Sequence, residues 1–268
     1  MIDWLQEELK RQPQLHLKRL AASELLQHLT LQSLYAQGAF KHLVFTGGTA
    51  LRLLYHTARY SEDMDFSLVA AKDFRFRTTL EKVRGDMVRQ NLTMEIHAKK
   101  EEKTVAKADL RFPGLLKELN LSPLKSEKLT LKVEIDKRPP AGGAPEIALV
   151  TEPISYTVAA FDLPSLFAAK LHALFFRGWI KGRDYYDLAW FLGKGVIPNF
   201  KLLNNAIRRT QGKGHGIMPR EFKQRILKHL KTVDFKRVRA EVERFLIRPE
   251  ESAFLALQPI ESLLRNYS

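Results

Sequence analysis

The sequence contains no cysteine, which excludes disulfide bonds, zinc ribbons and thiol-based catalysis. No apolar run approaches the roughly 18 to 20 residues that a membrane-spanning helix requires. The N-terminus begins Met1-Ile2-Asp3-Trp4 and lacks the apolar core of a signal peptide. The eight histidines show no metal-ligand spacing, and the chain has no internal repeat. We therefore expect a cytoplasmic protein that does not associate with membranes.

The charge of the chain is strongly positive, with 44 Lys and Arg against 30 Asp and Glu, a net +14. Residues 201–250 alone hold 14 basic and 5 acidic residues. Concentrated positive charge favours a phosphate-backbone partner, because each neutralised phosphate releases counterions. A solvated basic helix face or a membrane-surface patch would carry similar charge. No stretch pairs bulky aromatic residues with lysines as membrane anchors do, so we favour nucleic acid.

The first 160 residues mix helical and strand patterns. Apolar residues recur at helical spacing over residues 4–38, and the apolar run 43–45 predicts a buried strand that stops at Gly47-Gly48. Thr49 can cap a helix over 50–55. Residues 60–69 alternate, with Met64, Phe66 and Leu68 on one face. A further helix is expected at 74–91, and strands at 92–98, 104–112 and 129–136.

The second half of the chain is expected to be helical. Prolines and glycines interrupt residues 139–143, and a short strand at 154–158 is expected to close the sheet. Asp162 is a good N-cap, with Pro164 in the first turn. The predicted fold class is α+β: a mixed sheet flanked by helices, followed by an all-helical C-terminal domain. We expect an α/β domain over residues 1–160 and a helical domain with a basic surface over residues 161–268.

Two motifs suggest chemistry on a phosphate. Asp63 and Asp65 share one strand face, a spacing that suits hard divalent cations, and Asp is disfavoured inside strands. The strand–Gly47-Gly48–helix unit offers backbone N–H groups to a phosphate. Taken singly, the aspartates would indicate an exposed strand face and the glycines a tight turn. Taken together, they make the binding half of a nucleotidyl-transfer site.

Lys170 interrupts the apolar stripe of the helix expected over residues 163–176. A lysine in such a stripe faces a cleft, finds an anion, or extends its amine to solvent. Asp184 and Asp187 lie one turn apart near the start of the next helix. Asp184 could cap that helix, and its dipole would favour both acids.

The strings Phe45-Thr46-Gly47-Gly48-Thr49-Ala50-Leu51 and Arg59-Tyr60-Ser61-Glu62-Asp63-Met64-Asp65-Phe66 resemble the opening motif of the AbiEii/AbiGii toxin family. These toxins are nucleotidyltransferases of the polymerase-β-like superfamily, and the MenT toxins are similar. A second resemblance lies in Ala169-Lys170-Leu171-His172-Ala173-Leu174 and Arg183-Asp184-Tyr185-Tyr186-Asp187-Leu188. The resemblance spans residues 43–192 and leaves the basic C-terminal region uncovered.

The resemblance implies roles for these residues. The triphosphate would contact Gly47, Gly48, Thr49 and Ser61. Asp63 and Asp65 would hold Mg²⁺, or Mn²⁺ in its place, with a third carboxylate on a neighbouring strand. Glu134 is the candidate for that carboxylate, and Asp136 on the same face could substitute. Lys170 and Arg183 would contact the nucleotide phosphates, and Asp187 or Asp184 would be an essential acid that orients Lys170 or the nucleotide.

The expected activity transfers a nucleoside monophosphate from a nucleoside triphosphate to an acceptor hydroxyl and releases pyrophosphate. The basic C-terminal half favours RNA as the acceptor. Relatives of the MenT type modify the 3′ acceptor end of tRNA and block translation, and a separate antitoxin accompanies them. One alternative is transfer of AMP to a small molecule or to a protein side chain. Another is a catalytically silent RNA-binding module.

Overall fold

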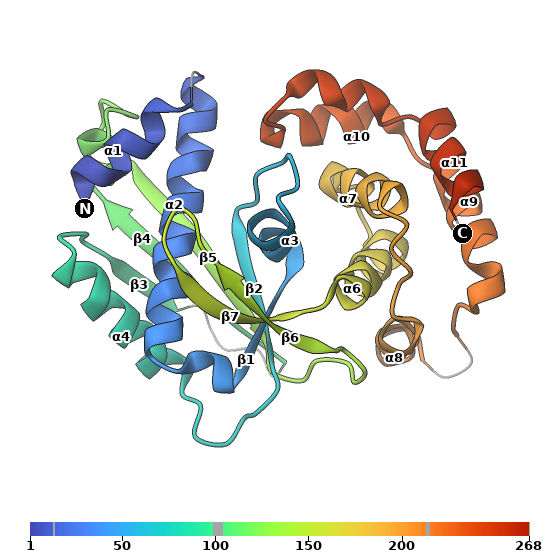
Figure 1. The fold of residues 1–268 in the computed structure, drawn as a ribbon, viewed down its shortest axis with the longest axis horizontal. Helices are drawn as coiled ribbons and strands as arrows, with labels where there is room; N and C mark the ends of the chain where they lie inside the picture. Colours follow the sequence, from blue (N-terminus) through green and yellow to red (C-terminus); the bar gives the residue numbers. More distant parts are fainter. Residues whose placement is uncertain (13, 99–103, 213–214, 268) are drawn as a thin grey trace. The chain divides into compact units, whose positions relative to one another are not determined.

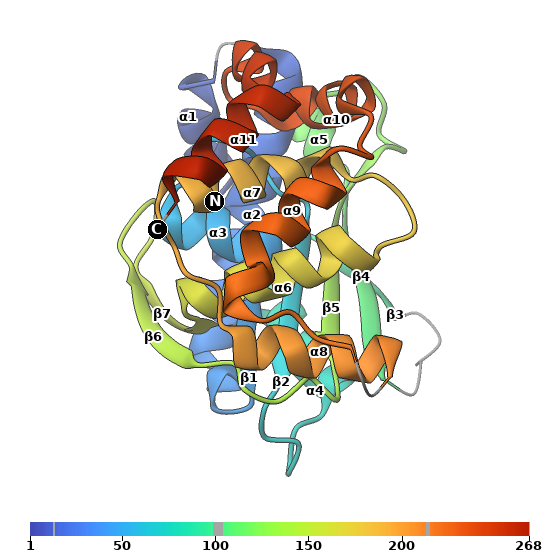
Figure 2. The same ribbon diagram turned by 90° about the vertical axis from the view of Figure 1, so that its right-hand side faces the viewer.

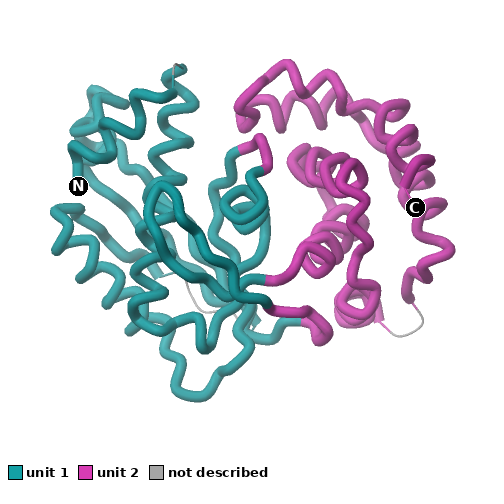
Figure 3. Tube along the Cα trace, in the orientation of Figure 1, with its two compact units in different colours: residues 1–56, 60–139, 146–160 teal, residues 57–59, 140–145, 161–268 magenta. Residues whose placement is uncertain are grey.

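The computed structural model describes residues 1–12, 14–98, 104–212 and 215–267, and its internal contacts divide the chain into two compact units (Figure 3). Unit 1 comprises residues 1–56, 60–139 and 146–160, and unit 2 comprises residues 57–59, 140–145 and 161–268. The two domains expected on either side of residue 160 stay a prediction, because this division also assigns two short earlier segments to unit 2. In the described part of the chain, no helix combines the length and the apolar character that crossing a bilayer requires.

Unit 1 is built on a mixed sheet, as predicted, with seven strands in the described residues (Figure 1). The strand order is β3-β4-β5-β2-β1-β7-β6. β2 runs antiparallel to β1 and parallel to β5, and β1 is parallel to β7. The bounds are β1 Leu43–Thr46, β2 Asp63–Leu68, β3 Glu95–Ala98, β4 Val105–Pro113, β5 Lys128–Asp136, β6 Pro145–Val150 and β7 Tyr156–Phe161.

Two helices, α2 (Leu15–Ala36) and α4 (Phe76–Arg89), pack against each other and against the sheet (Figure 1). The strands turn their apolar side chains toward them. Phe45 and Phe66 are fully buried with ring centroids 5.2 Å apart. Burying one such ring contributes about 1.5–3 kcal/mol. Because side chains alternate along a strand, this packing leaves Asp63 and Asp65 on the opposite, polar face.

The remaining elements of unit 1 correct two expectations. The predicted helical stretch over residues 4–38 consists of two helices, α1 and α2. β7 does not close the sheet, since it lies between β1 and the edge strand β6, which the sequence pattern did not indicate. The other elements are α1 Ile2–Lys10, η1 Ala39–Lys41, α3 Gly47–Tyr55 and α5 Leu115–Glu118.

Unit 2 is helical in its described residues (Figure 2). Aromatic residues form its centre: Phe167 and Phe191 stack with centroids 4.3 Å apart, and the ring of Phe222 meets Phe167 edge-on. The elements are α6 Leu163–Phe176, α7 Gly182–Gly193, α8 Phe200–Gln211, η2 Pro219–Glu221, α9 Phe222–Leu230, α10 Phe235–Val242, η3 Glu243–Phe245, η4 Pro249–Phe254 and α11 Leu257–Asn266.

Hydrogen bonds attach the two short early segments to the helices of unit 2. The backbone amide of Ile247 donates to the carbonyl of Ala58 at 3.1 Å, and the side chain of Asn199 donates to the carbonyl of Gly142 at 2.8 Å. α6 begins as predicted, because the carboxylate of Asp162 accepts a hydrogen bond from the amide of Ser165 at 2.9 Å. The segment 57–59 is thereby held beside residues of unit 2 that come more than a hundred positions later in the chain.

Candidate functional site

The turn from β1 into α3 presents two glycines at the end of a strand. Thr46 is extended, and Gly47 has φ +81°, a conformation that favours glycine. The helix starts at Gly47, so the expectation that Thr49 caps a helix from residue 50 is wrong. Thr49 is instead fully buried, and its hydroxyl donates a hydrogen bond to the backbone carbonyl of Asp63. Thr49 therefore ties the first turn of α3, which also contains the buried Gly48, to the start of β2.

Strand register determines which carboxylates are neighbours on the polar face. Asp63 and Asp65 lie on β2 with one residue between them. β5 runs parallel to β2, and the register places Glu134 opposite Asp65 and Asp136 opposite Ser67. The register thus places Glu134 next to Asp65 and Lys132 next to Asp63, whereas Asp136 lies two residues beyond Glu134 along β5.

The contacts of these carboxylates show what they could bind. Asp65 packs tightly against Gly47, and Glu134 forms an ion pair with Lys107 of β4, with 3.4 Å between Nζ and Oε2. Over the described ranges, no three His, Cys, Asp or Glu side chains converge into a ready metal site. However, both partners of the Lys107–Glu134 pair are about one-third exposed, and such pairs contribute only about 0–1 kcal/mol. The hard oxygen donors fit a divalent cation, for which Glu134 would have to leave Lys107.

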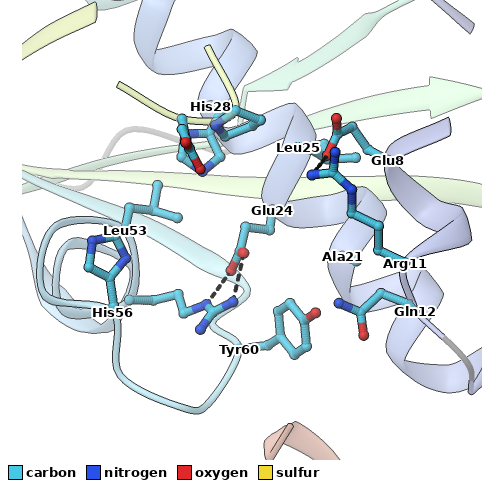
Figure 4. Close-up of a pocket in the computed structure, with 13 residues that line it drawn as sticks. Glu8, Arg11, Gln12, Ala21, Glu24, Leu25, His28, Leu53, His56 and Tyr60 are labelled. Carbon is cyan, nitrogen blue, oxygen red and sulfur yellow. Dashed lines mark hydrogen bonds and ion pairs between the residues drawn. The ribbon is translucent and has the colours of Figure 1, made fainter. Parts of the chain in front are cut away.

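The segment that leads into β2 is held by α2 and α3. Gln27 of α2 donates a hydrogen bond to the carbonyl of Ser61 at 2.8 Å. Arg52 of α3 lies over the ring of Tyr60, 4.9 Å from its centroid. It donates two hydrogen bonds to Glu24 at 2.6 and 2.9 Å, and dashed lines mark them at the labelled Glu24 in Figure 4. These last three side chains line part of a pocket of about 560 Å³ in unit 1. Ser61, which is buried, is therefore positioned through its backbone and its neighbours.

Replacing Gly47 with alanine is expected to damage both stability and activity. A Cβ at this position would lie 2.2 Å from Oδ2 of Asp65, and the positive φ adds strain of about 1–3 kcal/mol. Displacing Asp65 by about 1 Å can lower a catalytic rate roughly 100-fold. Thermal unfolding and a transfer assay measure the two effects. Gly193→Ala is the matched control, because its Cβ would meet no atom within 4 Å, and equal losses in both variants would contradict the explanation.

In unit 2, Arg59, Lys170 and Asp187 form a buried ion network. Arg59 is 1% exposed, and its Nε and Nη2 donate to the two carboxylate oxygens of Asp187 at 2.7 and 2.6 Å. Nζ of Lys170 lies 2.7 Å from Oδ2 of the same carboxylate. Burial acts to raise the pKa of Asp187, but the charges of Arg59 and Lys170 outweigh it and hold the pKa below its usual value. Lys170, which interrupts the apolar stripe of α6, is therefore paired with a carboxylate inside the protein.

Asp184 joins the same network from the first turn of α7. Its Oδ1 lies 3.3 Å from Nζ of Lys170, and its Oδ2 accepts a hydrogen bond from Arg177. Asp184 does not cap α7, because Lys181 occupies the cap position. Both Asp184 and Asp187 thus contact Lys170, and Asp187 is the closer of the two.

The structure places Arg183, the expected phosphate contact, against Phe245 and Glu241. Arg183 is 7% exposed, its guanidinium carbon lies 3.8 Å from the ring centroid of Phe245, and its Nε lies 3.4 Å from Glu241. These contacts anchor the start of α7 to α10 and η3.

Sequence reasoning missed Lys107 and Arg177. Both had a detectable signal. Lys107 and Asp109 alternate on β4 in the same polar pattern as the aspartates of β2, and Arg177 follows Lys170 by seven positions, about two helical turns. The strand order that brings Lys107 next to Glu134 was not visible in the sequence.

A mixed sheet that displays an aspartate pair beside a glycine turn is typical of a nucleotidyltransferase. The family model described as nucleotidyl transferase AbiEii toxin, type IV toxin–antitoxin system, matches residues 30–257, and the chain belongs to this family. The match extends beyond residues 43–192, over which the two motifs resemble this family, into the basic C-terminal region. Membership of this family implies a nucleoside triphosphate substrate and an antitoxin partner, and nucleotidyltransferases generally use divalent metals.

Solved structures with the same fold include two from Helicobacter pylori. JHP933 is 21% identical with a TM-score of 0.54, and the alignment covers 92% of this chain and 94% of that one. A candidate nucleotidyltransferase is also 21% identical with a TM-score of 0.55, covering 92% and 96% of the two chains. No match is found among curated proteins. At this identity the likeness establishes the fold alone.

Proposed function

We propose that the protein is the toxin of a toxin–antitoxin pair and transfers a nucleoside monophosphate from a nucleoside triphosphate to RNA. By resemblance to the MenT toxins, the acceptor is the 3′ end of tRNA, and the modification blocks translation. The acceptor hydroxyl forms a bond to the α-phosphorus, the bond from that phosphorus to the bridging oxygen breaks, and pyrophosphate leaves. The cognate antitoxin would neutralise this activity.

The observation that carries the proposal is the register that sets Glu134 opposite Asp65, which in turn packs against the glycine turn. Asp63, Asp65 and Glu134 would hold Mg²⁺, or Mn²⁺ in its place. A bound cation neutralises phosphate charge and holds the α-phosphorus for in-line attack. Glu134 would also accept the proton of the attacking hydroxyl. Asp136 is the substitute, although its register position favours Glu134.

The nucleotide-binding roles follow from the same geometry. The backbone of Gly47 and Gly48 at the start of α3 would receive phosphate oxygens, as would the hydroxyl of Ser61. Thr49 supports this turn through its bond to Asp63.

Roles in unit 2 rest on the ion network there. We assign Lys170 to the triphosphate, with Asp187 and Asp184 as the acids that orient its amine. Arg183 supports the position of α7 through its stacking on Phe245, and we keep its contact with the nucleotide phosphates as part of the proposal.

Charge supports RNA as the acceptor. Unit 2 holds 21 Lys and Arg against 10 Asp and Glu, a net +11, while unit 1 holds 23 against 20, a net +3. A small-molecule acceptor would not need this asymmetry, whereas an RNA backbone would be attracted by it.

Incubation of the protein with total RNA, magnesium and each labelled nucleoside triphosphate in turn tests the proposal. We expect label at the 3′ end of tRNA, located by nuclease mapping, and a rate that falls steeply with salt. Label confined to protein or to a small molecule would refute the RNA acceptor. A chain that binds tRNA but never transfers label would instead be a silent RNA-binding module.

A further inference from the structure

The loop that joins α6 to α7 carries an exposed aromatic ring next to cations. It runs from Arg177 through Trp179 to Lys181, and so connects the helix of Lys170 to the helix of Asp184. Trp179 is 71% exposed, and the guanidinium carbon of Arg177 lies 5.5 Å from its ring centroid. Exposing an indole to this degree forgoes the burial of a large apolar surface, so a partner that covers the ring would be stabilising.

The ion network beside this loop has more cations than anions. Among the residues that the structure describes, the ion pairs of Lys170 and Arg177 and the shortest one of Arg59 go to two carboxylates, Asp184 and Asp187, at distances of 3.3 Å or less. All five side chains are less than one-quarter exposed. One positive charge is therefore not balanced within the network, and the more accessible members, Lys170 and Arg177, are both cations.

Lys181 adds a further positive charge at the end of the loop. It is half-buried and makes no ion pair with any residue that the structure describes. Burial, together with the positive charges of Arg183 and Lys170, lowers the pKa of Lys181, because Asp184 does not fully offset them. A bound anion would relieve this repulsion.

We propose that the loop 177–181 binds one nucleotide, with its base stacked on Trp179 and its phosphate held by Arg177 and Lys181. The proposal deepens the proposed function and rests on it for the class of ligand. Every base has a face that can stack on an indole, and an arginine or lysine beside the ring suits the adjoining phosphate. The incoming triphosphate and the terminal nucleotide of the RNA acceptor share this chemistry.

A second exposed aromatic residue of unit 2 provides a contrast. Phe254 is 69% exposed, nearly as much as Trp179, but it lines a groove with Trp190, Leu255 and the carboxylate of Glu251. The charge of Glu251 is paired with Arg248, so this groove offers phosphate no excess of cations, whereas the loop 177–181 does. Phe254→Ala is therefore the matched control for removal of an exposed ring.

The test uses a full-length variant in which Trp4 and Trp190 are replaced by phenylalanine, so that Trp179 is the single tryptophan of the chain. We expect saturable quenching of its fluorescence by a stacked base. One titration uses a nucleoside triphosphate without RNA, and the other uses a single-stranded RNA oligonucleotide without triphosphate. No transfer occurs in either, and the ligand that quenches identifies the source of the nucleotide.

In the otherwise unaltered protein, Trp179→Ala is expected to weaken binding of that ligand about tenfold, with Trp179→Phe retaining most of the affinity. Lys181→Ala should weaken it several-fold and Lys181→Arg should restore it, while Phe254→Ala and the unit 1 control Lys41→Ala leave it unchanged. Thermal unfolding checks that each variant folds.

If the protein binds both ligands without quenching, or if Phe254→Ala weakens binding as much as Trp179→Ala, the proposal is wrong. Quenching without any transfer activity would refute only the proposed function.

Discussion

Replacing Asp65 with alanine is expected to lower nucleotidyl transfer by a factor on the order of 1,000 or more. The variant loses the carboxylate that packs against Gly47. Asp65 is also the residue that the strand register pairs with Glu134. Metal-mediated stabilisation of transition-state charge is worth several kcal/mol, and each 1.36 kcal/mol is tenfold in rate. Transfer of label from nucleoside triphosphate to RNA under single-turnover conditions measures the loss. In a bacterial host, expression of the wild-type chain should arrest growth and the variant should not.

This loss should come without a large fall in stability. Aspartate is unfavourable inside a strand, and Asp65 is placed on the polar face of the sheet, so its removal creates no cavity in the apolar core. The melting temperature of the isosteric Asp65→Asn variant is expected to stay within a few degrees of the wild type. A variant that keeps its activity would show that the metal site has been placed on the wrong residues.

A comparison of Glu134→Gln with Asp136→Asn distinguishes the two candidates for the third carboxylate. Register pairs Glu134 with Asp65, whereas Asp136 is paired with Ser67, so the first substitution should cost far more activity. The reverse order of effects would assign the role to Asp136.

The polar face of the sheet was predictable because alternation is a local property of a strand. Burial of Met64 and Phe66 on one side, and the opposite placement of Asp63 and Asp65, follow from the period of two. The neighbours of these aspartates did not follow. The parallel pairing of β2 with β5 joins residues about seventy positions apart, and no local pattern in either strand specifies it. Glu134 was therefore only a candidate, suggested by the resemblance, and Lys107 was missed.

Errors at helix starts share one physical cause. Side chains such as Thr49 and Asp184 are good N-caps by type, but here each makes a tertiary contact that local preference does not include. Thr49 bonds to the carbonyl of Asp63, and Asp184 binds Arg177 and Lys170. For Lys170 in its apolar stripe, the sequence left a cleft, an anion and solvent open, and the structure pairs it with Asp184 and Asp187. Arg59, which pairs with the same Asp187 carboxylate as Lys170, comes from a distant segment of the chain, and sequence spacing could not locate it.

Replacing Asp187 with alanine is expected to destabilise the protein by about 3–5 kcal/mol, since it deprives the buried Arg59 of the carboxylate that accepts its two hydrogen bonds. For a chain of this size, each kcal/mol shifts the melting temperature by roughly 2–4 °C, so thermal unfolding should show a fall of about 10 °C. Lys170→Met should abolish transfer with a smaller fall, because Asp187 keeps Arg59 and Asp184 keeps Arg177. Stability and activity then separate within one network.

The double variant Arg59→Met with Asp187→Leu removes both charges. It should recover at least half of the lost stability, because apolar residues replace a buried ion pair at little cost.

The pH dependence of stability tests the same charges. A depressed pKa for Asp187 means that its contribution is complete above the unfolded value near 3.8 and is lost only as the pH falls through the lower folded value. Urea unfolding at pH 5 and pH 8 should therefore give the same difference between wild type and Asp187→Ala. A difference that shrinks between those two values would mean that Asp187 is not held ionised by Arg59 and Lys170.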